Sequence, residues 1–190
     1  MEYRALGRTG LTVSVVGFGG WGIGGPTPGA DSYGVRSDAE NLAALGKAFD
    51  CGITFYNTAA AYGAGHSESL IGRAFHGSNR DQVVIATKAG VERFGEAPDW
   101  RPGALRASVE ASLARLDTDR IDLLQLHNPP TALLRERPEI LAALDKLRAA
   151  GKIRAWGLSL KSPLEGNDAL RSLDAPVLQV NLNQIGRAHV

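Results

Sequence analysis

Two patterns of apolar residues alternate along the chain. Short, nearly continuous apolar runs are typical of strands buried on both faces of a parallel sheet, whereas apolar residues three or four positions apart indicate helices that bury one face. The first pattern predicts strands at residues 13–18, 53–56, 83–87, 121–126, 153–159 and 176–182. The second predicts helices from Ser37 to Gly52, at 67–76, from Pro102 to Leu116, over the stripe from Ile140 to Leu147, and from Ser162 onward.

Capping and turn residues support these boundaries. Ser37 and Glu40 have the spacing of a capping box, and Pro102 stands where a proline is favoured in the first turn of a helix. At the start of the chain, residues 2–14 place short apolar runs on either side of a glycine-containing turn, which predicts a β-hairpin.

The order of these elements indicates a parallel sheet, built either as a doubly wound sheet or as a (β/α)8 barrel. Residues 17–22 fit the dinucleotide fingerprint G-x-G-x-x-G, but that motif requires its third glycine to open a helix. Here a loop rich in Gly and Pro continues to Ser37, and Asn57 rather than an acidic residue ends the second strand. We therefore predict a parallel (β/α)8 TIM barrel, incomplete here, with about six strands, five helices and an N-terminal β-hairpin.

Composition narrows the class of protein. Hydrophobic residues make up 44% of the chain, and 21 basic residues nearly balance 20 acidic ones, so no global field favours nucleic acid or an anionic membrane. No run approaches the roughly 18 apolar residues of a membrane span, and the charged start shows no signal peptide. Cys51 is the only cysteine, which suits a reducing compartment. We expect a cytoplasmic protein with one domain over residues 1–183.

Polar residues follow three successive predicted strands. Asn57 ends the second, Lys88 the third and His127 the fourth, while Tyr62 lies five residues beyond Asn57 in the same loop. Each alone has an ordinary explanation, such as a solvated charge or a structural hydrogen bond. Because the carboxyl ends of barrel strands form one rim, where catalytic groups gather, their joint occurrence favours an active site.

Four segments carry a resemblance to a known family: FYNTAAAYGAGHSE (55–68), VVIATKAG (83–90), DLLQLHNPP (122–130) and ALGRTGLTVSVVGFGGWG (5–22). Together they resemble the aldo-keto reductases. The resemblance implies an oxidoreductase that uses NAD(P)H, with NADPH expected and no metal, to interconvert small carbonyl compounds (aldehydes, ketones or aldoses) and alcohols.

The resemblance also implies roles for single residues. Tyr62 would be the general acid, Lys88 would stabilise its phenolate, and His127 would orient the substrate carbonyl. Asn57 would hydrogen-bond the Lys88 ammonium and the cofactor ribose. The residues expected at the cofactor are Gly20, Trp21, Gly22, Asn57, Ser159 and Gln179, with Ser159 and Gln179 at the nicotinamide carboxamide; Gln179 as a structural polar group of the barrel interior stays open.

Two positions depart from the family pattern. The family has aspartate where this chain has Asn57, so Lys88 lacks a charged partner and a lowered lysine pKa is expected. The family commonly has asparagine where Leu160 stands, which removes one carboxamide contact. Reduced chemistry is expected from Asn57, and a non-catalytic, nucleotide-binding regulatory protein on the same fold is the alternative.

The last seven residues, 184–190, break the apolar pattern of the sixth strand. They match the in-frame translation of a common sequencing-library adapter, which predicts a non-native tail after residue 183. Six strands do not close an eight-stranded barrel, and the family's phosphate-binding loops follow later strands. We therefore expect the 190 residues on their own to be inactive.

Overall fold

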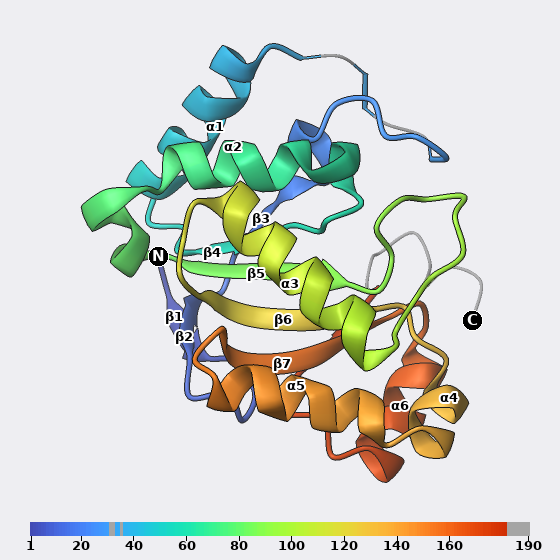
Figure 1. The fold of residues 1–190 in the computed structure, drawn as a ribbon. Coiled ribbons are helices and arrows are strands. Elements are labelled where there is room, and N and C mark those ends of the chain that lie inside the picture. Colours follow the sequence, from blue (N-terminus) through green and yellow to red (C-terminus); the bar gives the residue numbers. More distant parts are fainter. Residues whose placement is uncertain (31–32, 35, 182–190) are drawn as a thin grey trace, which may run out of the picture.

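The computed structural model describes residues 1–30, 33–34 and 36–181, and its centre is one curled sheet (Figure 1). In sheet order the strands are β3 (Phe18–Gly19), β4 (Phe55–Asn57), β5 (Val84–Ala89), β6 (Ile121–His127), β7 (Ile153–Leu160) and β8 (Leu178–Val180). Every neighbouring pair is parallel. This curled, parallel sheet confirms the predicted barrel fold for the described part of the chain.

Helices cover the outer face of the sheet, as Figure 1 shows for α2, α3 and α5. The helices are α1 (Asp38–Asp50), α2 (His66–Ala74), α3 (Pro102–Leu116), α4 (Thr131–Glu136), α5 (Glu139–Ala149) and α6 (Pro163–Ser172). The predicted capping box at the start of α1 is present: the Glu40 amide donates to Ser37 Oγ and the Ser37 amide donates to the Glu40 carboxylate. The predicted helix boundaries therefore hold to within a few residues.

Two apolar clusters hold the sheet in place. The larger lies between the sheet and the helices and includes Leu70, Ile85, Leu105, Leu124 and Leu144. The smaller lies inside the curl, where the side chains of Leu11, Val13, Val84, Ala86, Leu123 and Ala155 pack together. Leu11 and Val13 come from the N-terminal hairpin of β1 (Tyr3–Ala5) and β2 (Thr12–Ser14), so the predicted hairpin is confirmed and closes the amino end of the curl.

Two predictions about elements need correction. The predicted strand 13–18 is wrong, because β2 ends at Ser14 and Val15 and Val16 are 47% and 53% exposed. The Val15 amide donates to the Glu2 carbonyl, so Val13 to Val15 belong to the hairpin, and the parallel sheet begins only at Phe18 in β3. Helix α4 was not predicted, because its six residues are too few to show a helical repeat. The predicted tail at 184–190 lies outside the described residues.

Candidate active site

Along each strand the inner face changes from apolar to polar. Side chains two residues apart share a face, so Ala86 and Lys88 of β5 both project into the curl. On β6 the same face carries Leu123, then Gln125 and His127. The polar residues thus lie at the carboxyl ends of the strands, which is the end where (β/α)8 barrels bind ligands.

Lys88 occupies the centre of this polar end and is 1% exposed. Its Nζ donates to Asn57 Oδ1 at 2.5 Å, to the Thr58 carbonyl oxygen at 2.8 Å and to the Tyr62 hydroxyl at 3.2 Å. An ammonium group has three N–H donors, and all three have an acceptor here. The structure therefore brings Asn57, Tyr62 and Lys88 together, as the strand-end pattern predicted.

In the part of the chain that the structure describes, no carboxylate accepts a hydrogen bond from Lys88. Burial lowers the pKa of the Lys88 amine to about 7, while the charge of Glu68 acts in the opposite direction. Glu68 is itself fully buried and accepts from Thr87 Oγ1 at 2.5 Å and from Arg115 Nε at 2.6 Å. Near neutral pH the charge of Lys88 is therefore sensitive to small changes in its surroundings.

Tyr62 is positioned by a tight turn after β4, a 3₁₀ turn at Tyr62–Gly65. Gly63 has φ of 60°, and a Cβ built there would lie 2.0 Å from the Gly24 carbonyl oxygen, so the turn and the loop after β3 touch backbone to backbone. Burial raises the pKa of the Tyr62 hydroxyl, and the phenol holds its proton at neutral pH. Release of that proton therefore needs a positive charge nearby, and Lys88 is the group in contact.

His127 ends β6 and is 5% exposed. Its ring meets those of Tyr62 and Phe94 edge to face, with centroids 6.2 Å and 5.7 Å away. Burial, then the charges of Lys88 and Lys161, lowers the pKa of the imidazole to about 4. A neutral imidazole lies beside the Tyr62 ring, with its buried Nδ1 unpaired among the described residues.

Three carboxamides meet beside Lys88. Asn57 Nδ2 donates to Gln125 Oε1 at 3.1 Å and to Gln179 Oε1 at 3.0 Å. Gln125, which sequence reasoning missed, is 1% exposed and lies two residues before His127 on the same face. That period-two spacing is the signal that could have identified it. Gln179 therefore contacts the site from β8.

The loop after β3 supplies an aromatic wall. Trp21 lies edge-on to Tyr62, with ring centroids 4.9 Å apart, and to Phe94 at 5.4 Å. Trp21 was expected at this site, whereas Phe94 was missed because no strand or helix pattern marks the loop that carries it. These rings and His127 form an aromatic cluster around Tyr62.

The remaining predicted residues, Ser159, Gly20 and Gly22, lie near these side chains. Ser159 stands between His127 and Gln179 in the strand register and is nearly buried. Gly20 is buried where Ser67 Oγ donates to its carbonyl oxygen at 2.8 Å, and Gly22 follows in the same short turn. Lys88 donates to none of the three, so the structure places them beside the group of Asn57, Tyr62 and Lys88 rather than within it.

Comparison with known proteins settles the family. The model of the Aldo/keto reductase family matches residues 15–187. The chain belongs to the aldo/keto reductase family. The aldo-keto reductase YhdN of Bacillus subtilis is 38% identical over 184 residues, which cover 91% of this chain and 51% of YhdN. The D-threo-aldose 1-dehydrogenase of a Pseudomonas species is 32% identical over 206 residues, covering 93% of this chain and 59% of the relative.

Solved structures agree with this family. The holo form of an aldo-keto reductase from Bacillus halodurans superimposes with a TM-score of 0.80 at 28% identity, covering 96% of this chain and 58% of that structure. The chain spans about half the length of the curated relatives it matches, from 44% to 61%. The described sheet therefore corresponds to part of an aldo/keto reductase barrel.

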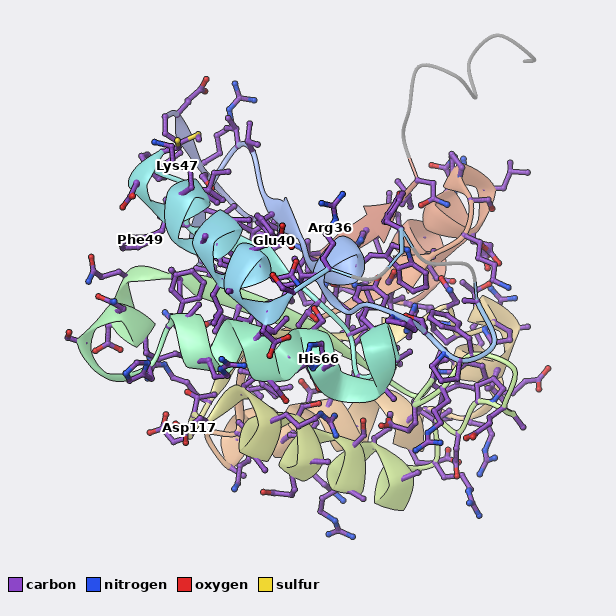
Figure 2. The ribbon with its side chains drawn as sticks, turned by 90° about the horizontal axis from the view of Figure 1, so that it is seen from above. Arg36, Glu40, Lys47, Phe49, His66 and Asp117 are labelled. Atoms are coloured by element: carbon purple, nitrogen blue, oxygen red, sulfur yellow. The ribbon has the colours of Figure 1, made fainter. Side chains whose placement is uncertain are left out.

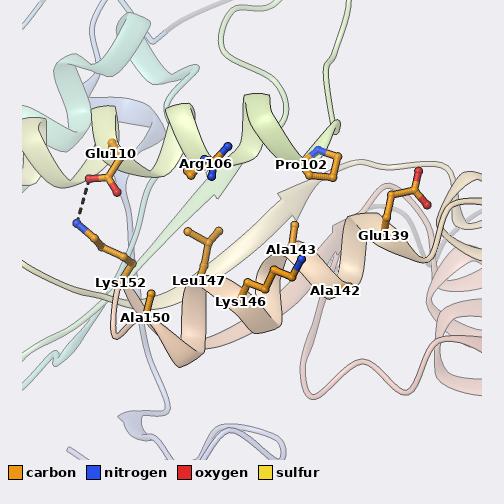
Figure 3. A pocket seen from close by; sticks show the side chains of 10 residues that line it. All are labelled: Pro102, Arg106, Glu110, Glu139, Ala142, Ala143, Lys146, Leu147, Ala150 and Lys152. Carbon is orange, nitrogen blue, oxygen red and sulfur yellow. Dashed lines mark hydrogen bonds and ion pairs between the residues drawn. The ribbon is translucent and has the colours of Figure 1, made fainter.

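Other features of this aldo/keto reductase chain lie apart from the site. A cavity of about 450 Å³ opens between α3 and α5 on the outside of the sheet, where Lys152 Nζ donates to Glu110 at 3.1 Å (Figure 3).

Within residues 1–30, 33–34 and 36–181, no three His, Cys, Asp or Glu side chains gather as a metal site would require. In the same residues no helix has the length and apolar character needed to cross a membrane.

Proposed function

We propose that the protein containing these residues is a nicotinamide-dependent oxidoreductase that interconverts small aldehydes, ketones or aldoses and the matching alcohols. The observation that carries the proposal is the buried Lys88 amine, 3.2 Å from the Tyr62 hydroxyl, with His127 beside the same ring. Membership of the aldo/keto reductase family supports it, as do relatives named D-threo-aldose 1-dehydrogenase and 6-dehydroglucose reductase.

Tyr62 is the proposed proton donor. Its ring packs against Trp21, and burial raises the pKa of its hydroxyl, so the proton is present when a carbonyl arrives. As the carbonyl oxygen gains negative charge, Tyr62 transfers its proton to that oxygen and becomes a phenolate. Lys88 in its ammonium form stabilises this phenolate, and the reaction therefore requires Lys88 to be protonated.

His127 is the proposed group that orients the carbonyl. Its pKa of about 4 keeps the imidazole neutral, so one ring nitrogen can donate a hydrogen bond without adding a charge. A neutral donor at this place also avoids repulsion with Lys88. Trp21 and Phe94 exclude water from the space beside Tyr62 and His127.

The described residues fit the nicotinamide end of the cofactor. Ser159 and Gln179 are paired in register, where they present a hydroxyl and a carboxamide on adjacent strands. Gln179 uses Oε1 to accept from Asn57, which leaves its amide N–H groups to donate to a carboxamide oxygen. A bound reduced nicotinamide would supply the hydride. Gly20, Trp21 and Gly22 form the neighbouring wall of the proposed binding site.

NADPH is the proposed form of this cofactor, by resemblance to the family. One relative is named an NADH-specific methylglyoxal reductase and is 32% identical over 203 residues. Carbonyl reduction assayed with NADPH and with NADH in parallel therefore tests which cofactor is used.

A regulatory, non-catalytic protein is the second candidate. A relative from Schizosaccharomyces pombe bears the name of a voltage-gated potassium channel subunit beta and is 32% identical over 200 residues. The uncharged Asn57 beside Lys88 favours this candidate. The contact of Lys88 with Tyr62 favours catalysis, because a binding protein has no need of a proton donor.

Replacing the proton donor separates the two candidates. Tyr62→Phe in the full-length protein removes the hydroxyl and retains the ring that packs on Trp21. We expect carbonyl reduction to fall by about 10²- to 10⁴-fold, while binding of NADPH, followed by fluorescence titration, changes little.

Tyr3→Phe is the matched control, since Tyr3 donates to the Gly52 carbonyl oxygen near the hairpin and lies outside the site. Its turnover should equal that of the parent protein. Turnover by Tyr62→Phe as fast as that of Tyr3→Phe would refute the role of Tyr62, and cofactor binding without turnover in the parent would favour the regulatory candidate.

A further inference from the structure

We propose that Gln125 is a positioning residue that sets the orientation of the Asn57 amide, so that the oxygen of this amide, and not its nitrogen, faces Lys88. The proposal rests on the proposed function, since it concerns the lysine that acts on Tyr62. Gln125 touches Asn57 and acts on Tyr62 only through it.

An asparagine at this place needs to be oriented. Its amide has an acceptor oxygen on one side and two N–H donors on the other. Rotated by half a turn, Asn57 would present N–H groups to the Lys88 amine, and the shortest contact of Lys88 would become a repulsive one. An aspartate has two equivalent acceptor oxygens and no donor, so it would need no such control.

Gln125 lies where it can set the orientation of the Asn57 amide. Both N–H groups of Asn57 have acceptors, one on Gln125 and one on Gln179, and these acceptors match only the observed orientation. Gln125 is 1% exposed in the middle of the inner face of β6, between Leu123 and His127. Buried at this place, Gln125 Oε1 faces Asn57 Nδ2 at 3.1 Å.

Gln179 is less suited to this role. It lies on β8, where its side chain is exposed and faces the proposed nicotinamide position. A side chain that also contacts the cofactor changes its hydrogen bonds as the cofactor comes and goes. Gln125 is therefore the acceptor that remains with Asn57 throughout a catalytic cycle.

A double-mutant cycle in the full-length protein tests this idea. Gln125→Met keeps the length of the side chain and removes the acceptor. In the parent background we expect turnover at neutral pH to fall about tenfold, because Asn57 is free to rotate and Lys88 loses a partner. In the Asn57→Asp background the same change should alter turnover less than about twofold, because a carboxylate needs no orientation.

The lysine itself gives a readout that does not depend on activity. The titration midpoint of Lys88 can be followed by NMR of the labelled side chain. It should be lower in Gln125→Met than in the parent protein. In the Asn57→Asp background, Gln125→Met should leave the midpoint almost unchanged. The other titratable groups that act on or contact this amine are Glu68 from α2, Tyr62 from its turn and His127 from β6, and they are the same in all four proteins.

Leu123→Met is the control for repacking, since Leu123 lies on the same face two residues before Gln125. It should leave both turnover and the Lys88 midpoint unchanged. Equal losses from Gln125→Met in both backgrounds would show that Gln125 only fills space and would overturn the proposal. A parent protein that reduces no carbonyl would refute the proposed function, while the Lys88 titration would still decide the role of Gln125.

Discussion

Two cations are buried at opposite ends of β5, and their partners differ. At the amino end, Arg80 Nη2 donates to Asp122 Oδ2 at 2.7 Å, and Asp122 also accepts from the Ile85 amide and from Arg154 Nη1. At the carboxyl end, Lys88 is surrounded by neutral oxygen acceptors. One buried cation thus has a carboxylate in contact, and the other has none.

This difference suits the Arg80–Asp122 pair to a structural role and Lys88 to a role in which its protonation state changes. Removal of one partner from a buried ion pair leaves an unpaired buried charge, which destabilises the fold. A buried amine without a counterion loses its proton easily, which is why the pKa of Lys88 lies near 7. The sheet therefore holds Arg80 in a salt bridge, whereas Lys88 can gain and lose its proton near neutral pH.

The largest expected effect comes from breaking the paired site. Asp122→Ala leaves the buried Arg80 without its carboxylate partner and the Ile85 amide without its acceptor. We expect the free energy of unfolding to fall by about 3–5 kcal/mol, measured by urea denaturation of the full-length protein. Asp81→Ala breaks an exposed pair with Arg120 and should cost less than about 1 kcal/mol. Equal decreases in the free energy of unfolding of the two variants would show that burial does not make the Asp122 pair more stabilising than the exposed one.

The second effect is the pH dependence of stability caused by Lys88. Its pKa is about 7 in the folded protein and 10.5 without burial, so between these values the unfolded chain binds more protons. Stability should therefore rise with pH across this window, by at most about 1.4 kcal/mol per pH unit, and Lys88 should add no slope below it. Lys88→Met removes the titrating group, and subtracting its urea-denaturation profile isolates the effect. Identical profiles for the two proteins would place the pKa of Lys88 near its ordinary value.

A third effect follows from making the two sites alike. Asn57→Asp gives Lys88 a carboxylate partner, which raises the pKa of the amine and keeps it protonated at neutral pH. If protonated Lys88 is the active form, a pKa of 7 leaves about a quarter of the protein active at pH 7.5, so turnover should rise about fourfold there. The pH profile of kcat checks this, with its alkaline limb moved to higher pH. No gain would mean that the asparagine is an adapted feature of this protein.

The smallest effect is expected at an exposed cluster. Asp38 at the start of α1 accepts from His66 Nε2 at 2.9 Å and from Arg73 Nη1 at 2.7 Å, both on α2, and Figure 2 shows His66 at the start of that helix. Solvent screens these partly exposed charges. Asp38→Asn should change the melting temperature much less than Asp122→Ala does. A comparable loss would make this cluster a second structural ion pair.

Most of the fold was predictable because each buried strand is an apolar run with a helix after it. The segment from Val13 to Phe18 misled, since Val15 and Val16 resemble a buried strand but follow the hairpin and lie exposed. Hydrophobicity reports what a strand can bury, and the hydrogen bond from Val15 to Glu2 decides where the segment lies. Helix α4 shows the other limit, because a helix of two turns has no repeat to detect.

The candidate site was predictable at the ends of strands and not along them. Lys88 and His127 each end an apolar run, so their positions are conspicuous. Gln125 lies inside such a run, where one polar residue looks like a tolerated exception. The contact between Lys88 and Tyr62 also depends on how the loop after β4 closes, which no local pattern specifies. Side-chain partners come from tertiary structure, whereas the sequence pattern gives only the face on which a residue lies.

The packing of the loop that carries Phe94 depends on the absence of a side chain at position 29. Gly29, with φ of 77°, lies against the backbone of the loop that carries Phe94, and a Cβ there would stand 2.0 Å from the Phe94 carbonyl oxygen. Any larger residue at position 29 must push the two loops apart and carry the Phe94 ring away from Trp21 and His127. A substitution that adds atoms would therefore loosen the packing of the three rings, and a protein engineer who wants more space beside His127 would begin at position 29 rather than by trimming the aromatic side chains.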